Sequence, residues 1–420
     1  MARPALSGRR KLTPGELDII LAAHARFVAG QPGGKRLSLP FVDFTGFDLS
    51  GREMSGAELS GSVFDAARLT GARLNGANLS GCDLRGADLR GAFLARADLR
   101  GACLQSANLA HADLTGVDLR PGKVARPHPS KGFPAVVEEP RSGEADNAVL
   151  TGATLDDSRL DGLHAPGTDF SDCSLRGAML TDANLKDAVF SSALMEGAKV
   201  EGANLEGANL KRAVLTGVGL ATARTRGARL EGALTDAPRV SALRTDKIAG
   251  LLKGHDAWVR SGGKEGQRAV IDGEDMRPHA EALKGLRLTA ISAKRTCLVG
   301  LDLTGAQLQG ADLEEADLRG AVLKDADLRG ARLPRADLTK AKLDAALLSP
   351  LPLGGGRSTP TNLSGARLRG AFARGADLSG AALADADLKG CDLAGATLAA
   401  VELSPQQKRA ARGLALGDED

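Results

Sequence analysis

Acidic residues recur at regular places in this chain, and they are the first candidates for chemistry. Asp83, Asp88, Asp98, Asp113 and Asp118 each stand immediately before a leucine. Converging carboxylates can bind a metal ion or serve as general acid and base. Such chemistry also needs a concave site that excludes water. Because these aspartates recur at a fixed spacing, the sequence favours a structural role, in which short polar side chains bond the backbone at bends.

Other motifs of known chemistry are lacking. The chain contains no HExxH, no paired CxxC and no GxSxG, and residues 116–123 lack the glycine spacing and the Ser or Thr of a phosphate-binding loop. The six histidines are scattered: His24, His111, His128, His164, His255 and His279. His24 and His255 occupy matched places, where a ligand role and a packed or hydrogen-bonded role are the alternatives, and the second is favoured. We therefore expect no catalytic, cofactor-binding or metal-binding residues, no cofactor and no enzyme activity.

A period of five residues determines where all these side chains lie. From Ala72 to Leu119 a leucine recurs at every fifth position, and the residue two before it is small and nearly always Ala. Five fits neither the 3.6-residue period of a helix nor the two-residue period of a strand. Four such units can close one square coil of about 20 residues, and coils can stack at about 4.8 Å. The Leu and the small residue then point inward, and occasional rings such as Phe64, Phe170 and Phe190 replace Leu.

The repeated unit resembles the A(D/N)LXX signature of the pentapeptide-repeat family over most of the chain. The resemblance implies an all-β solenoid, a right-handed quadrilateral β-helix. Two stretches with a helical apolar face precede repeats. Leu21, His24, Phe27 and Val28 in the first match Leu252, His255, Trp258 and Val259 in the second. We infer an internal duplication, which gives two tandem arrays, each preceded by a capping helix.

The register of the repeats predicts the boundaries. In order, we expect a flexible basic N-terminus (1–11), an N-terminal capping helix (12–30), a first repeat array (39–242) with a loop insertion (121–147), a second capping helix or linker (243–268), a second array (269–403) with an insertion (349–360), and a C-terminal tail (404–420). The tail either closes the far end or pairs with a second copy, so a homodimer is one alternative. Within the first array, the pattern weakens around Leu163 and from Thr225 onward.

Composition restricts the function classes. The net charge is +3, with 55 basic and 52 acidic residues, which favours neither a nucleic-acid partner nor an acidic surface. Five Cys without paired spacing indicate a reduced, cytoplasmic setting, and Cys82, Cys173 and Cys391 fall at the small inward position. No segment approaches the ~18 apolar residues of a membrane span.

Three functions are compatible with these features. The first is a non-enzymatic scaffold that presents its faces and two loops to a protein partner. The second follows from the resemblance: some members of the family mimic B-form DNA and bind DNA gyrase. Here the balance of acids and bases argues against mimicry, since DNA carries one charge per about 1.7 Å. The third uses the basic residues Arg3, Arg9, Arg10 and Lys11 to bind DNA or a membrane surface.

Overall fold

The computed structural model describes residues 9–128, 132–237, 242–283 and 285–414. The chain divides into two units, Met1–Asp236 (unit 1) and Ala237–Asp420 (unit 2). Each unit has its own hydrophobic core.

Both units are built from stacked coils, and each coil is made of four repeats. Asn78 forms a parallel bridge to Asp98 in the next coil, and Asp98 bridges in turn to Asp118. The N–H of Leu79 donates to the carbonyl of Asp98 at 2.8 Å, and the N–H of Asp98 donates to Ala77 at 3.0 Å. Each repeat supplies one bridging residue and a two-residue turn, so a coil has four sides. The extended segments are too short to count as regular strands, but the coils stack as a β-helix solenoid.

The period of five places the apolar side chains inside. Leu89 and Ala87, for example, are both completely buried, and this pattern holds along both units except in their last coils. Each fully buried Leu contributes roughly 1.5–3 kcal/mol of stability. Phe170 and Phe190 stack in the interior with ring centroids 4.9 Å apart, one coil above the other. The predicted inward positions are therefore confirmed.

Unit 1 begins with helix α1 (Pro14–Val28). Thr13 caps it, and Leu17 and Leu21 are buried in the same core as the first coils. Strand β1 (Arg10–Lys11) pairs in parallel with β2 (Val42–Asp43), so the prediction of a flexible segment is wrong for residues 10 and 11. Backbone hydrogen bonding to the first coil orders them. The rest of that predicted segment, residues 1–8, lies outside the described residues.

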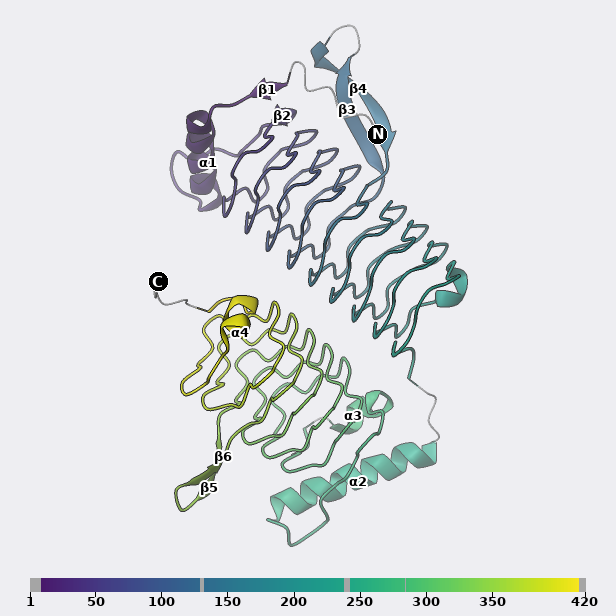
Figure 1. The fold of residues 1–420 in the computed structure, drawn as a ribbon, viewed down its shortest axis with the longest axis vertical. Helices are drawn as coiled ribbons and strands as arrows, with labels where there is room; N and C mark the ends of the chain where they lie inside the picture. The colour runs from purple at the N-terminus through teal and green to yellow at the C-terminus, as the bar shows by residue number, and fades with distance from the viewer. Residues whose placement is uncertain (1–8, 129–131, 238–241, 284, 415–420) are drawn as a thin grey trace. The chain divides into compact units, whose positions relative to one another are not determined.

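The first insertion is a hairpin and not a loop. Strands β3 (Gly122–His128) and β4 (Gly132–Arg141) pair antiparallel and project from the coil wall (Figure 1). Glu144 already bridges to Cys103, so the coil resumes before residue 147, the predicted end of the insertion. The early return was missed because Ala145 occupies a position that leucine usually fills. The 3₁₀ helix η1 (Leu220–Thr222) lies in the last coil, and bridging in unit 1 ends at Leu234.

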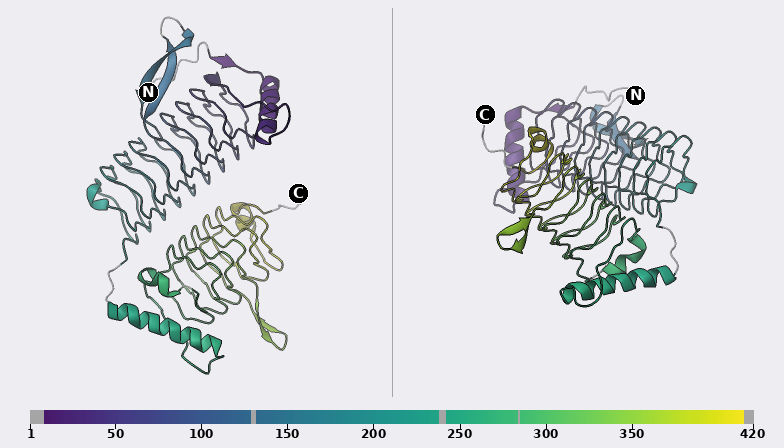
Figure 2. Two further views of the ribbon diagram at one scale, coloured as in Figure 1. Left: turned by 180° about the vertical axis from the view of Figure 1, so that it is seen from behind. Right: turned by 60° about the horizontal axis from the view of Figure 1, so that its bottom comes forward.

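Unit 2 begins with the long helix α2 (Ala242–Arg260), followed by η2 (Arg277–His279) and α3 (Ala280–Leu283). The first bridge of this unit, from Val270 to Ser292, spans η2 and α3. From Arg287 the bridges keep the ordinary coil spacing except where they cross the second insertion, as from Arg332 to Asn362. A second hairpin, β5 (Leu351–Gly354) and β6 (Arg357–Thr359), projects from this wall (Figure 2). Helix α4 (Pro405–Ala410) follows the last repeats, and Arg412 still bridges to Asp392.

Candidate functional site

The aspartates that precede the leucines bond the turn of their own repeat. Oδ1 of Asp88 accepts a hydrogen bond from the backbone N–H of Arg90, two residues on, at 3.2 Å. Asp or Asn makes the same contact in many repeats of both units, for example at 2.9 Å in Asp169 and 3.4 Å in Asn184. The bond gives a turn N–H an acceptor, as such short side chains commonly do. The predicted backbone role of these residues is confirmed.

An arginine two residues after the aspartate adds a second contact. Arg100 Nε and Nη2 donate to Asp98 Oδ1 and Oδ2 at 2.9 and 2.7 Å. Arg120 Nε and Nη2 donate to Asp118 Oδ1 and Oδ2 in the same way, at 2.9 and 2.8 Å. Asp98 and Asp118 lie one coil apart and stack through their backbone bridge. The same pairing recurs in both units at Asp83–Arg85, Asp88–Arg90, Asp275–Arg277, Asp317–Arg319 and Asp327–Arg329.

At Asp88 the pairing with arginine favours the ionised carboxylate. Hydrogen bonds from the Arg90 side chain hold the pKa of Asp88 below its ordinary value, and Asp98 in turn raises the pKa of Arg100. A general acid at neutral pH needs a raised pKa, so these shifts are opposite to what acid catalysis requires.

The thiols are equally unsuited to chemistry. Burial raises the pKa of Cys82, Cys103 and Cys391 to about 12, and that of Cys297 to about 11. Because the thiolate is the reactive form, these side chains stay unreactive at neutral pH. Cys82, Cys173 and Cys391 are buried at the small inward position, as predicted.

The matched histidines occupy equivalent places in the two units. His24 of α1 and His255 of α2 are completely buried. Nδ1 of His24 accepts a hydrogen bond from the N–H of Leu37 at 3.0 Å, and Nδ1 of His255 accepts one from Ala269 at 3.0 Å. Each ring stacks on an aromatic ring three residues on, with centroids 6.0 and 5.7 Å apart. The hydrogen-bonded role that the sequence favours for both histidines is confirmed.

The remaining histidines lie in unrelated places. His164 is on the outer wall, with Nδ1 3.0 Å from Asp146 Oδ1, whereas His279 is buried at the end of η2. His111 lies in a turn and His128 ends β3. In the part of the chain that the structure describes, no three His, Cys, Asp or Glu side chains gather as metal ligands. Among the helices described there, none has both the length and the apolarity needed to cross a bilayer.

The two hairpins are the projecting elements of the walls (Figures 1 and 2). In the second, Leu351 packs over the turn glycine Gly330, where an added Cβ would come within 2.6 Å of the Leu351 Cβ. Further out, Leu353 is 56% exposed, and Gly354 and Arg357 are exposed as well. The base of this hairpin is therefore fixed on the wall, while its tip presents an apolar side chain to solvent.

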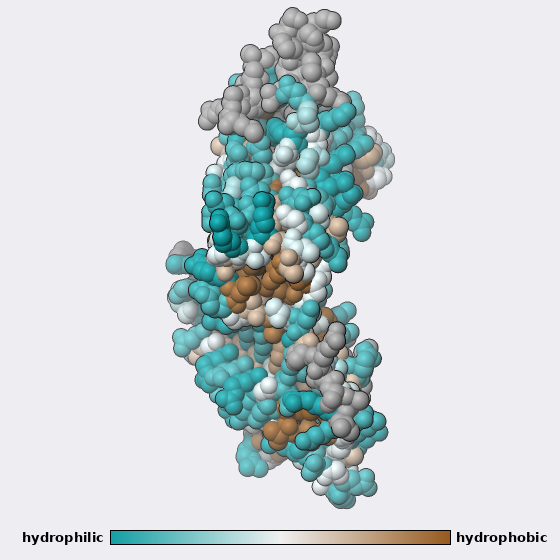
Figure 3. All heavy atoms as spheres, turned by 90° about the vertical axis from the view of Figure 1, so that its right-hand side faces the viewer, coloured by the Kyte–Doolittle hydropathy of each residue, from teal (hydrophilic) through white to brown (hydrophobic). Residues whose placement is uncertain are grey.

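Sequence reasoning did not predict an open apolar end on unit 1. In the last coil, inward positions that are fully buried elsewhere become accessible, and Leu230 is 41% exposed. Figure 3 shows an apolar patch over this coil. The half-buried residues at the other inward positions are Val218, Leu220, Ala223, Ala228 and Ala233. The weakened repeat pattern from Thr225 onward was the available signal.

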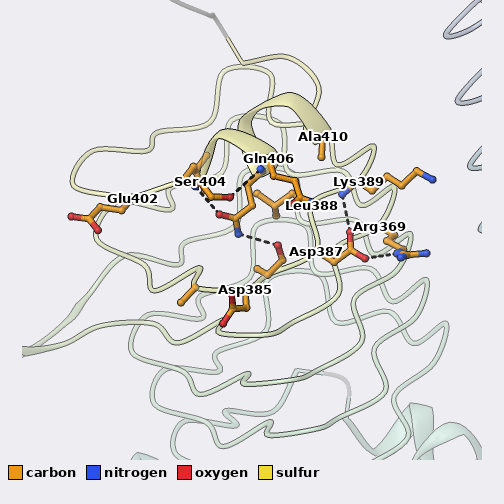
Figure 4. A pocket seen from close by; sticks show the side chains of 13 residues that line it. Arg369, Asp385, Asp387, Leu388, Lys389, Glu402, Ser404, Gln406 and Ala410 are labelled. Atoms are coloured by element: carbon orange, nitrogen blue, oxygen red, sulfur yellow. Dashed lines mark hydrogen bonds and ion pairs between the residues drawn. The ribbon is translucent and has the colours of Figure 1, made fainter.

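A groove of about 810 Å³ lies beside α4 in unit 2 (Figure 4). Several of its polar side chains already bond the protein. Arg369 Nε contacts Asp387 Oδ2 at 2.5 Å, and Nε2 of Gln407 donates to the carbonyls of Leu383 and Ala386 at 2.8 and 2.9 Å. The arrangement fastens α4 to the last repeats.

Comparison with known proteins places these features in a family. The model of pentapeptide repeats matches residues 43–81, 82–120, 153–191, 168–207, 193–233, 288–325, 302–339, 312–349 and 361–398, more than half of the chain. No curated protein sequence matches the chain.

Several solved structures are similar. Rfr23, a pentapeptide-repeat protein from the cyanobacterium Cyanothece 51142, is 30% identical over 31% of this chain and 87% of its own, with a TM-score of 0.21. HetL, from the cyanobacterium Nostoc sp. strain PCC 7120, is involved in heterocyst differentiation regulation; it is 28% identical over 53% of this chain and 94% of its own, with a TM-score of 0.20. QnrB1, a plasmid-mediated fluoroquinolone resistance protein, is 19% identical over 54% of this chain and 96% of its own, with a TM-score of 0.25. On the matches to its repeats, the chain belongs to the pentapeptide-repeat family.

Proposed function

We propose that this protein is a non-enzymatic scaffold for protein–protein interaction and that its two hairpins contact the partner. In this proposal the coils are a right-handed quadrilateral β-helix, in two arrays that α1 and α2 cap. The burial of Leu17 and Leu21 in the first core, and of Ile248 and Leu252 in the second, supports the capping role. A helix over the first coil replaces the neighbour that this coil lacks, because each repeat is stabilised by its neighbours.

The observation that carries the proposal is the register on either side of each hairpin. Cys103 and Glu144 flank the first hairpin and bridge directly, and Glu144 bridges on to His164 at the ordinary coil spacing. Arg332 likewise bridges to Asn362 across the second hairpin, and the ordinary spacing then continues. Both hairpins are thus additions that leave the coil phase unchanged, on a wall that closes without them. Elements that are dispensable for the core and project from the wall are suited to recognition.

The chemistry of the walls supports the same conclusion. In pairs such as Asp98–Arg100 the outward aspartate bonds its own turn and its own arginine, and four of the five cysteines are buried. Solvated ion pairs of this kind add about 0–1 kcal/mol each, so their effect is mainly on solubility and surface pattern. The five cysteines are free, which supports a reducing, cytoplasmic setting.

The test removes each hairpin without changing the coil phase. One variant lacks residues 121–141, which joins Arg120 to Ser142 and restores the ordinary coil spacing between Cys103 and Glu144. The other lacks residues 351–360 and carries Pro350→Gly, because the second turn position needs a positive φ. Affinity capture from the native cytoplasm, followed by mass spectrometry, should show a protein bound to the intact chain and lost from at least one variant.

A third variant serves as the matched control. Removal of residues 72–91 takes out one complete coil and leaves both hairpins in place. Circular dichroism checks that all three variants keep the solenoid fold. Partner capture should survive the removal of the single coil 72–91. If both hairpin deletions retain the same captured proteins as the intact chain, hairpin-mediated binding is wrong.

The alternative is a DNA-mimic protein that binds DNA gyrase. The Asp–Arg pairs weigh against it, because each neutralises an acid that would have to stand for a phosphate. In a DNA supercoiling assay with purified gyrase, we expect no inhibition even at a large excess of the protein. Inhibition that persists in both hairpin deletions would favour the alternative over the scaffold.

A further inference from the structure

The two units share one buried device at their N-terminal ends. A histidine in the preceding helix accepts, through Nδ1, the backbone N–H of the residue at which the chain enters its first coil. In unit 1 that residue is Leu37, and in unit 2 it is Ala269. The residue before it is an arginine in both units. Arg36 donates to the carbonyl of Gly56 in unit 1, and Arg268 donates to the carbonyl of Ala290 in unit 2. The repetition of this set of contacts in two separate units shows that it is built into the fold.

These contacts require the neutral imidazole. An Nδ1 that accepts a hydrogen bond carries no proton, so the ring proton sits on Nε2. In His24, Nε2 faces the carbonyl of Ser55 at 3.1 Å and can donate to it. In His255, Nε2 is buried near the backbone of Leu288 and Thr289, without regular hydrogen-bond geometry to any described residue. Protonation of either ring would set an N–H against the backbone N–H, with both donors buried.

We propose that His24 and His255 are acid-sensitive latches, whose protonation releases α1 and α2 from the first coils of their units. Release breaks the bond to Leu37 or Ala269 and uncovers the apolar interior of the first coil. The device is independent of which partner the hairpins bind. Acid would therefore open the N-terminal end of each array and leave the rest of the wall intact.

The surroundings favour this direction. Burial lowers the pKa of His24 below its ordinary value of 6.5; Glu53 on the first coil and Arg36 after the helix act in opposite directions. Burial also lowers the pKa of His255, where Arg268 adds to the effect and Asp256 opposes it. A lowered folded pKa means that the opened state binds more protons below pH 6.5. The attachment of each helix is therefore complete above this pH and weakens as the pH falls toward the folded pKa.

Hydrogen–deuterium exchange on the full chain, between pH 7 and pH 4.5, tests the proposal. After correction for intrinsic exchange rates, the opening constant of peptides from α1 and α2 should rise by up to about tenfold per pH unit below 6.5, as expected for uptake of one proton. His24→Asn retains an acceptor for the Leu37 N–H but does not titrate. This variant should remove the pH dependence from α1 and leave it in α2, and His255→Asn should do the reverse.

Two further measurements keep the result decisive. His164 lies on the outer wall beside Asp146, so His164→Asn should leave the behaviour of both helices unchanged. In the unsubstituted protein, ¹⁵N shifts of the ring nitrogens should show unprotonated Nδ1 atoms and midpoints below 6.5 at His24 and His255. The proposal is overturned if both histidines titrate at or above 6.5, or if each helix keeps its pH dependence in its own Asn variant.

Discussion

At the residue scale, the turn explains why aspartate is frequent and how some repeats do without it. In many repeats a side-chain oxygen accepts the N–H of the first turn residue. Where Phe93 replaces the aspartate, Oδ1 of Asn75 in the preceding coil accepts from Ala95 at 3.1 Å. Where Ser174 replaces it, Oδ1 of Asp156 in the preceding coil accepts from the N–H of the following turn at 3.0 Å. An aspartate in these turns is therefore mainly an acceptor for a backbone N–H. For this reason the abundance of aspartate in the sequence is not evidence for a catalytic site.

A second residue-scale rule links turn glycines to the coil beneath them. Gly202 has a φ of +69°, and a Cβ added there would overlap Oδ1 of Asp182, one coil earlier. Gly76 has a similar φ of +62°, but an added Cβ would meet nothing within 4 Å. Gly76→Ala should cost about 1–2 kcal/mol of unfolding free energy from backbone strain alone. Gly202→Ala should cost more than this in urea unfolding, and Asp182→Ala in the same chain should recover the difference. Equal costs for the two glycine substitutions would contradict the packing rule.

At the scale of elements, local signals decide which segments leave the repeat. Thr13, Pro14 and Glu16 start α1 as a capping box, and Ser404, Pro405 and Gln407 start α4 in the same way. Both hairpins are inserted at coil corners, where a longer connection leaves the neighbouring bridges unchanged. The repeat thus tolerates insertion at a turn, and α1 and α4 begin where cap residues precede the helix.

The cap of α1 permits a test at this scale. Thr13 Oγ1 accepts the N–H of Glu16 at 3.3 Å, and the Glu16 side chain accepts the N–H of Thr13 at 2.8 Å. Thr13→Ala should destabilise the helix by about 1 kcal/mol, which increases its opening constant about fivefold in hydrogen exchange. Thr13→Ser retains the hydroxyl and should leave the rate nearly unchanged. The peptide containing α4, which has its own cap, is an internal reference. An equal effect on α4 would show that the change is not local.

At the scale of the whole molecule, the sequence predicts the repeat well and its interruptions poorly. The five-residue period identifies the inward positions, because Leu and Ala recur at positions that only a closed coil can bury together. The matched apolar faces of the two helical stretches identify the helices, and His24 and His255 fall at equivalent places in them. The hairpin strands 122–128 and 132–141 escape prediction, because their sequence is rich in Pro and charge and no repeat specifies their pairing. Cross-coil contacts such as Asn75 to Ala95 are equally hidden, since they depend on which side chains stack from one coil to the next.

The separation of the chain into two units leads to a prediction about unfolding. Each unit has its own core, and the stability of stacked repeats is passed only between neighbours. Leu89 in unit 1 and Leu328 in unit 2 are both completely buried, so replacing either by Ala should cost about 2–5 kcal/mol. Trp258 is the single tryptophan of the chain and lies in α2, so its fluorescence reports unit 2. In urea, Leu328→Ala should lower the midpoint of the fluorescence transition. Leu89→Ala should leave that midpoint unchanged and lower the midpoint of the circular-dichroism transition of unit 1. A fluorescence midpoint that falls equally with both substitutions would mean that the two arrays unfold as one cooperative body.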